Sequence, residues 1–189
     1  MIAKIVEKLL LVRNAKRLKK TKSKFLSIGE NCQLQYDIRV SFPEKLSLGK
    51  NVYIGPNVTL NALGGIEIEN GVIIGPNVFI HSANHRFKDA DYLPYDQYHV
   101  FKKVIIKENV WISANVCIVP GATIGEGSII GMGAVVSGEI PPLSIVVGNP
   151  CKVISQRDKL HYEELKKNGK IYLEEKMKGL ISPDYYTVI

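Results

Sequence analysis

An aliphatic residue returns every six positions over most of this 189-residue chain, and this period constrains the fold more than any other feature. Groups of three such residues start at positions 28, 48 and 68, twenty apart, and later at 106 and 124, eighteen apart. The residues are Ile28, Leu34, Val40, Leu48, Ile54, Leu60, Ile68, Ile74, Ile80, Ile106, Ile112, Ile118, Ile124, Ile130 and Val136. A short repeat of this kind predicts a solenoid, and the 3.6-residue spacing of an amphipathic helix is not seen here.

The residue types between the aliphatic positions indicate the shape of each coil. Glycine often follows the aliphatic residue, as at Gly29, Gly49, Gly55, Gly75, Gly125 and Gly131. A small or β-branched residue stands four places after it, as at Val52, Val58, Val78, Val110, Val116, Ala122, Ser128 and Ala134. Glycine permits tight corners and positive φ, and β-branched residues suit short strands. Three six-residue units therefore predict a triangular coil whose aliphatic and small side chains point inward.

The rhythm breaks at "IHSANHRF" (80–87) and resumes only at Ile106. The break predicts an excursion loop at 86–103, which carries three carboxylates, Gln97 and aromatic side chains. Aromatic faces beside hydrogen-bonding groups suit a sugar. The alternative is a packed loop that its aromatic residues hold against a neighbouring subunit.

Composition and charge narrow the class of protein. Hydrophobic residues make up 46% and charged residues 23%, which is typical of a globular domain, and no apolar run approaches the roughly 18 residues of a membrane-spanning helix. Three widely spaced cysteines predict neither a disulfide framework nor a zinc site, and they favour a reducing cytoplasm. Residues 1–24 hold nine Lys or Arg against one Glu, whereas the rest of the chain, with 16 basic and 17 acidic residues, has a net charge of −1. Because the basicity belongs to one end, a nucleic-acid-binding face is not expected.

Three segments are expected. Residues 1–24 have the pattern of a basic amphipathic helix, which either covers the open end of the solenoid or attaches to an anionic membrane surface. Residues 25–154 form the solenoid domain. Residues 155–189 form a helical extension, with two short helices broken at Asn168–Gly169.

The run "VWISANVCIVPGATIGEGSIIGMGAVVSGEIPPLSIVVGNPCKVI" (110–154) resembles the hexapeptide-repeat acetyltransferases, and within them the sugar and polysaccharide O-acetyltransferase branch. The resemblance implies an all-β solenoid, a left-handed parallel β-helix of about five triangular coils. It also implies a homotrimer with an active site between adjacent subunits. The co-substrate would be acetyl-CoA, with no metal.

The resemblance also assigns roles at the acceptor side. His85 matches the general base that takes the proton from the attacking hydroxyl, since imidazole titrates in the right range. The alternative is a polar residue at a loop mouth. Asn84 either orients this base or caps the turn, and Asn61 either binds the acceptor or forms a turn. Trp111 borders the cleft or anchors the core edge, and Gln97 is a substrate-binding candidate in the excursion.

The CoA side is assigned in the same way. Ala114, Met132, Ser137 and Gly138 match positions along the pantetheine arm, and the backbone N–H of Ala114 is a candidate oxyanion donor. Lys152, assisted by Arg157, matches a basic residue near the nucleotide phosphates.

The predicted function is acetyl transfer from acetyl-CoA to a hydroxyl of a sugar or glycan, of capsule, exopolysaccharide or O-antigen type. The alternatives are an N-acetyltransferase on a nucleotide-linked amino sugar, a xenobiotic acetyltransferase, and a non-catalytic β-helix scaffold. The expected location is the cytoplasm, with residues 1–24 as the segment for any peripheral membrane contact.

Overall fold

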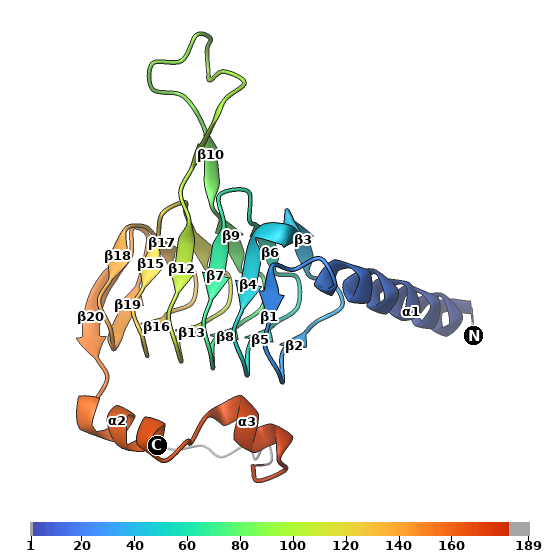
Figure 1. Cartoon of the computed structure of the whole chain (residues 1–189), viewed down its shortest axis with the longest axis vertical. Helices are drawn as coiled ribbons and strands as arrows, with labels where there is room; N and C mark the ends of the chain where they lie inside the picture. Colours follow the sequence, from blue (N-terminus) through green and yellow to red (C-terminus); the bar gives the residue numbers. More distant parts are fainter. Residues whose placement is uncertain (1, 182–189) are drawn as a thin grey trace.

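The computed structural model describes residues 2–181 and confirms the predicted parallel β-helix (Figure 1). Three sheets form the faces of a prism, and the described residues make six coils rather than about five. The first sheet contains β1 (Ser27–Ile28), β4 (Leu46–Leu48), β7 (Ile66–Ile68), β12 (Val104–Ile106), β15 (Thr123–Ile124) and β18 (Glu139–Ile140). The second contains β2 (Gln33–Leu34), β5 (Tyr53–Ile54), β8 (Ile73–Ile74), β13 (Trp111–Ile112), β16 (Ile129–Ile130), β19 (Ser144–Val147) and β20 (Lys152–Gln156). The third contains β3 (Arg39–Ser41), β6 (Thr59–Asn61), β9 (Phe79–His81), β14 (Cys117–Ile118) and β17 (Val135–Val136), and the short 3₁₀ helix η1 (Pro43–Lys45) follows β3.

The core is the stack of inward residues that the six-residue period predicts. From Leu48 onward every predicted aliphatic position is buried, and so is every predicted small position. Successive coils pair in parallel register, so that Ile54 lies beside Ile74 and Ile112 beside Ile130. Each fully buried aliphatic side chain contributes about 1.5–3 kcal/mol of transfer free energy. The core is therefore one continuous column along the solenoid.

The glycines that follow the aliphatic residues have a different role from the one predicted. None of the six has a positive φ. Instead, each approaches the next coil so closely that a side chain would collide with it: an added Cβ on Gly55 would lie 2.9 Å from the carbonyl carbon of Gly75. Ser113 occupies the same place in its coil as Gly55 and Gly75, and it follows Ile112, which pairs with Ile130 of the next coil.

Asparagine makes most of the left-handed turns at the corner between the second and third sheets. Asn57, Asn77 and Asn115 have φ values of 56°, 58° and 58°, in the left-handed region that Asn tolerates better than most residues. The Asn57 side-chain amide also donates a hydrogen bond to the Asn77 side-chain oxygen, at 2.8 Å. The corner residues therefore stack from coil to coil as the core residues do.

The excursion leaves the prism at the predicted corner but begins earlier than predicted. Its stem is an antiparallel hairpin of β10 (Ala83–His85) and β11 (His99–Phe101), in which His85 pairs with His99. The chain leaves and returns at one point, because the Lys102 amide donates to the Ser82 carbonyl at 2.9 Å. His85, the last residue of β10, thus lies on the stem of the excursion rather than beside it, and Figure 1 shows β10 where the excursion leaves the prism.

The N-terminal helix α1 (Ile2–Lys22) covers part of the first coil and then extends away from the solenoid (Figure 1). Leu18 is buried in the core cluster, and the Arg17 guanidinium approaches the Tyr36 carbonyl at 3.4 Å. The helix is not amphipathic over its whole length, contrary to the prediction. The reason is that the apolar side of its first half lies opposite the apolar side of its second half. Within the described residues, no helix combines the length and apolarity that a membrane crossing needs.

The C-terminal segment contains the two predicted short helices, α2 (Lys159–Lys167) and α3 (Tyr172–Met177), with Gly169 at φ 63° between them. Tyr162 anchors α2, because its hydroxyl donates to Glu126 and accepts from Asn109. Burial, together with Glu126, raises the pKa of Tyr162 to about 12. Before these helices, β20 runs antiparallel to β19 and across the predicted boundary at 154/155. Residue 1 and residues 182–189, the outer ends of the predicted segments 1–24 and 155–189, lie outside the described residues.

The close approach of the coils yields a stability prediction. Replacing Gly125 with alanine places a Cβ 2.4 Å from the Pro142 nitrogen and 2.7 Å from the Ile140 carbonyl oxygen. Overpacking of this kind costs about 1–3 kcal/mol, which corresponds to a fall in Tm of roughly 3–10 °C for a chain of this size. The control is Ser113→Ala, at the residue that follows the aliphatic position of a strand in the second sheet, where a Cβ is already present. Equal melting temperatures for the two variants, followed by circular dichroism, would contradict the role given to Gly125.

Candidate active site

The edge of the prism between the third and first sheets carries the excursion, and we call it the excursion edge (61–65, 81–103, 119–122 and 137–138). His85 projects from it on β10, in a rigid hairpin. Asn61 ends β6 one coil below and pairs in register with His81. Ser137 and Gly138 follow β17 two coils above the excursion. The structure therefore gathers the predicted residues Asn61, Asn84, His85, Ser137 and Gly138 along one edge.

Two aromatic rings hold the His85 imidazole. The Tyr95 ring stacks on it with a centroid distance of 3.9 Å and an interplanar angle of 15°. The cross-strand His99 ring lies 4.6 Å away. The Nδ1 atom of His85 is buried and has no hydrogen-bond partner within residues 2–181. Nε2 is consequently the ring nitrogen that can meet a substrate.

The neighbouring predicted residues have mainly local contacts. The Asn84 side-chain oxygen accepts a hydrogen bond from the His85 backbone N–H at 2.9 Å, a local contact within β10. The Asn61 side-chain oxygen accepts from the Leu63 backbone N–H at 3.3 Å, a turn contact. Gln97 is exposed in the excursion. Roles for these three residues toward an acceptor stay predictions.

A cavity of about 400 Å³ opens beside His85. It is lined by Asn84, His85, Arg86, Phe87, Lys88, Val100, Lys102, Val119 and Pro120. Among these described residues there is no carboxylate, and Lys88 and Lys102 make no ion pair with the described part of the chain. Sequence reasoning missed the two lysines and the Tyr95 contact, since only the hairpin register brings both sides of the excursion together. The cavity joins apolar walls to cationic groups next to an imidazole.

An ion-pair network holds the excursion loop in shape. The Arg86 guanidinium donates to the buried Asp96 carboxylate, with Nε at 2.6 Å, and to Asp91 at 2.8 Å. Asp96 also accepts from the Tyr98 backbone N–H at 3.0 Å, and the guanidinium lies over the Tyr98 ring. The hydrogen bond from Arg86 lowers the pKa of Asp96, so that the carboxylate stays ionised in acid. This network lies next to Tyr95 in the loop and therefore supports the ring that stacks on His85.

A second set of predicted residues lies on a different edge, between the second and third sheets, which we call the second edge (113–115, 131–133 and 148–151). Ala114 and Met132 follow the adjacent strands β13 and β16, and the Gly133 amide donates to the Ala114 carbonyl at 3.0 Å. Lys152 begins β20 beside this edge, paired with Val147, and is exposed. A single chain therefore does not bring Ala114, Met132 and Lys152 together with His85.

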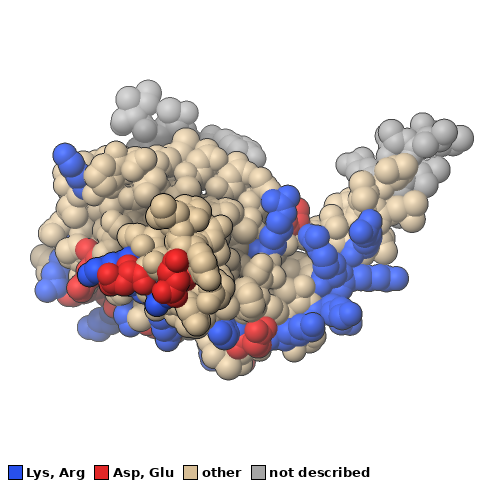
Figure 2. Space-filling view, turned by 90° about the horizontal axis from the view of Figure 1, so that it is seen from above, with Lys and Arg blue, Asp and Glu red and all other residues tan. Residues whose placement is uncertain are grey.

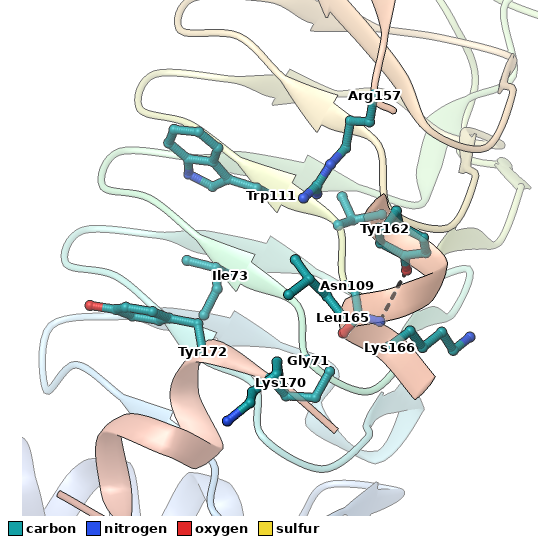
Figure 3. Close-up of a pocket in the computed structure, with 12 residues that line it drawn as sticks. Gly71, Ile73, Asn109, Trp111, Arg157, Tyr162, Leu165, Lys166, Lys170 and Tyr172 are labelled. Atoms are coloured by element: carbon teal, nitrogen blue, oxygen red, sulfur yellow. Dashed lines mark hydrogen bonds between the residues drawn. The ribbon is translucent and has the colours of Figure 1, made fainter. Parts of the chain in front are cut away.

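Trp111 and Arg157 lie in another pocket, of about 160 Å³, between the second sheet and the C-terminal helices (Figure 3). The Trp111 side chain is half exposed at its rim. The Arg157 guanidinium donates to the Gly127 carbonyl at 3.3 Å and lies over the Tyr162 ring. Arg157 thus helps to attach α2, whereas Lys152 is exposed and makes no ion pair within residues 2–181. Within residues 2–181, no group of three or more His, Cys, Asp or Glu is placed to hold a metal ion.

Comparison with known families identifies the repeat. The family described as "Bacterial transferase hexapeptide (six repeats)" matches residues 103–138, and "Hexapeptide repeat of succinyl-transferase" matches residues 45–82. A search of curated proteins found no match. The two matched ranges fall on either side of the excursion, within the prism.

Solved structures extend the likeness to most of the chain. A maltose O-acetyltransferase from Clostridium difficile 630 is 33% identical, with a TM-score of 0.70 over 77% of this chain and 76% of the other. A hexapeptide-repeat acetyltransferase from Vibrio cholerae, complexed with acetyl-CoA, is 28% identical, with a TM-score of 0.69 over 76% and 78%. A point mutant of an N-acyltransferase from Bacillus cereus, in complex with dTDP and coenzyme A, is 26% identical, with a TM-score of 0.65 over 82% and 95%. The fold and these relatives define an acyltransferase of the β-helix type. The chain belongs to the hexapeptide-repeat acetyltransferase family.

The ion-pair network yields a prediction for the excursion. In Asp96→Asn the charge partner of Arg86 is lost, and we expect cleavage of 86–98 by a low concentration of protease to accelerate at least about tenfold, because the loop opens more often. Asp89→Asn, an exposed substitution in the same loop, is the control. In the wild type, protection is expected to be complete above the ordinary Asp range, to weaken as pH falls from that range toward the lowered pKa of Asp96, and to be lost below it, because a depressed carboxyl pKa stabilises the folded form only while the unfolded carboxyl is ionised. Equal cleavage rates for the two variants would contradict the role of the Arg86–Asp96 ion pair in holding the loop in shape.

Proposed function

We propose that this acetyltransferase moves the acetyl group of acetyl-CoA to a hydroxyl of a sugar or glycan, with His85 as general base. The observation that carries the proposal is the placement of the His85 imidazole, which a hairpin and two rings hold beside an open cavity. The similar maltose O-acetyltransferase supports a sugar hydroxyl as acceptor. The similar structure complexed with acetyl-CoA supports the donor.

The reaction needs one base and one anion-stabilising donor. The acceptor O–H gives its proton to Nε2 of His85 while its oxygen attacks the thioester carbonyl carbon. The C–S bond of the resulting tetrahedral species then breaks, and the departing CoA sulfur takes the proton from the imidazolium. The oxyanion requires a hydrogen-bond donor. The backbone N–H of Ala114 is suited to this role, because it makes no hydrogen bond within residues 2–181.

A complete site requires two copies of the chain. His85 lies on the excursion edge, whereas Ala114 and Met132 lie on the second edge and Lys152 lies beside it. Placing the excursion edge of one subunit against the second edge of the next joins the base to the predicted CoA residues. We therefore include a homotrimer in the proposal, because a ring of three such contacts closes on itself.

N-acylation of a nucleotide-linked amino sugar is the second candidate, and the similar N-acyltransferase complexed with dTDP and coenzyme A favours it. The two candidate reactions differ in how strongly each depends on His85 as a general base. An amine acceptor is already partly deprotonated near neutral pH, whereas a hydroxyl is not, so a strong dependence on His85 favours O-acetylation. Product analysis with hydroxyl and amino acceptors of matched sugars separates them.

The first test measures release of free CoA from acetyl-CoA over a panel of sugar acceptors. We expect His85→Ala to lose about 10²-fold or more in kcat with an unchanged Kd for acetyl-CoA, because general-base catalysis has that size. His161→Ala, an exposed histidine on α2, is the control and should match the wild type. A wild-type rate of turnover by His85→Ala would show that His85 is not the general base. Failure of the wild type to bind acetyl-CoA or to use any acceptor would favour a scaffold instead.

The second test addresses the shared site. Lys152→Glu is expected to raise the Kd for acetyl-CoA roughly 10- to 100-fold, because it replaces a charge-assisted contact to phosphate with repulsion. Mixed oligomers of His85→Ala and Lys152→Glu subunits should regain part of the wild-type rate. In some subunit interfaces the Lys152→Glu subunit supplies an intact His85 and the His85→Ala subunit supplies an intact Lys152. No recovery in oligomers shown to be mixed would place the whole site within one subunit.

A further inference from the structure

The N-terminal helix carries a charge that the rest of the molecule does not share. Nine basic residues and one glutamate lie within residues 1–24, whereas the remaining 165 residues have a net charge of −1. Figure 2 shows basic side chains gathered around α1 where it leaves the solenoid. The last turn of the helix alone contributes Lys19, Lys20 and Lys22. This concentration of charge is not required by the fold, since among the described side chains of α1 it is Leu18 that is buried in the core.

The outer half of α1 exposes large apolar side chains to solvent. Leu9 is 63% exposed and Leu10 is 49% exposed. Val6, Leu11 and Val12 are exposed to a similar degree. An exposed apolar cluster on a helix that projects from the fold marks an interaction surface.

The helical period places Leu9 and three basic residues on one side of α1. Leu9 and Leu18 are nine residues apart, about two and a half turns, so Leu9 faces away from the side that packs on the solenoid. Arg13, Lys16 and Lys20 follow Leu9 at intervals of four, three and four residues, which keeps them on the side of Leu9. All three are exposed, and within the described part of the chain none of them makes an ion pair. The outward side of α1 is therefore apolar toward its N-terminal end and cationic toward the prism.

We propose that the outward side of α1 docks this acetyltransferase on an anionic lipid membrane. The apolar cluster enters the boundary between headgroups and acyl chains, and the cations that follow it meet the lipid phosphates. The helix lies at the surface rather than across the bilayer. Because α1 packs on the solenoid through the opposite side, its outward side is accessible to a membrane surface.

Charge complementarity favours an anionic membrane over a second copy of the chain or a nucleic acid as the partner of α1. A second copy of α1 would bring two strongly cationic helices together, which like-charge repulsion opposes. Nucleic acid would satisfy the cations but leave Leu9 and Leu10 exposed to water. An anionic surface with an apolar interior contacts both the exposed leucines and the cations of the outward side of α1.

The experiment is co-sedimentation of the full chain with vesicles of phosphatidylcholine, alone or mixed with phosphatidylglycerol. We expect binding only to the mixed vesicles, weakened by salt. Lys16→Glu with Lys20→Glu should lower the partition coefficient at least about tenfold, since each cation near the surface contributes roughly fivefold. Lys159→Glu with Lys167→Glu, an equal charge change on α2, is the matched control and should bind as the wild type does.

A third variant separates a membrane from other anionic partners. Leu9→Asn with Leu10→Asn keeps every charge, and we expect it to lose at least about tenfold in vesicle binding. Circular dichroism confirms folding of each variant. Absence of wild-type binding, equal loss in the α2 control, or full binding by the leucine variant would each overturn the proposal. A lower oligomeric state of the leucine variant by sedimentation velocity, without wild-type vesicle binding, would assign the surface to a second copy instead.

Discussion

The backbone hydrogen bonds between successive coils are the interaction on which the rest of the molecule depends. They continue through the corners as well as the strands, as where the Asn77 amide donates to the Pro56 carbonyl at 3.0 Å. This continuity fixes a short distance between coils, and at positions such as Gly55 and Gly125 the short distance leaves no room for a Cβ. The same distance brings inward side chains into contact with the residues one coil above and below, so that a ladder of isoleucines becomes a core.

Much of this architecture could be predicted from the sequence because a period of six ties each aliphatic residue to one face of the prism. The burial of Ile54, Ile112 and their equivalents follows from that period, as does the corner at which the chain departs. The turning residues were harder to assign. Glycine satisfies both a left-handed corner and a close approach, so its presence alone does not say which is required, and Asn57 carries the positive φ that Gly55 does not.

The surroundings of the candidate base depended on features that local patterns do not contain. The stacking of Tyr95 and His99 on His85 requires the register of a hairpin whose strands are separated by thirteen residues (86–98) without regular structure. The division of the predicted site between two edges follows from the coils themselves, since each six-residue unit occupies one face of the prism. Resemblance supplied the residues, and only the coil geometry shows that His85 and Met132 occupy different edges of one chain.

The excursion leaves and re-enters the prism at neighbouring atoms, where the Lys102 amide meets the Ser82 carbonyl. The coils above and below consequently keep their register whatever the loop contains. Insertions, deletions and exchanges within 86–98 change the wall of the cavity at no cost to the column of isoleucines. Such a molecule separates the part that evolution can vary from the part that it must keep: the segment beside the cavity can change in length and sequence, while the stacked coils of the prism stay as they are.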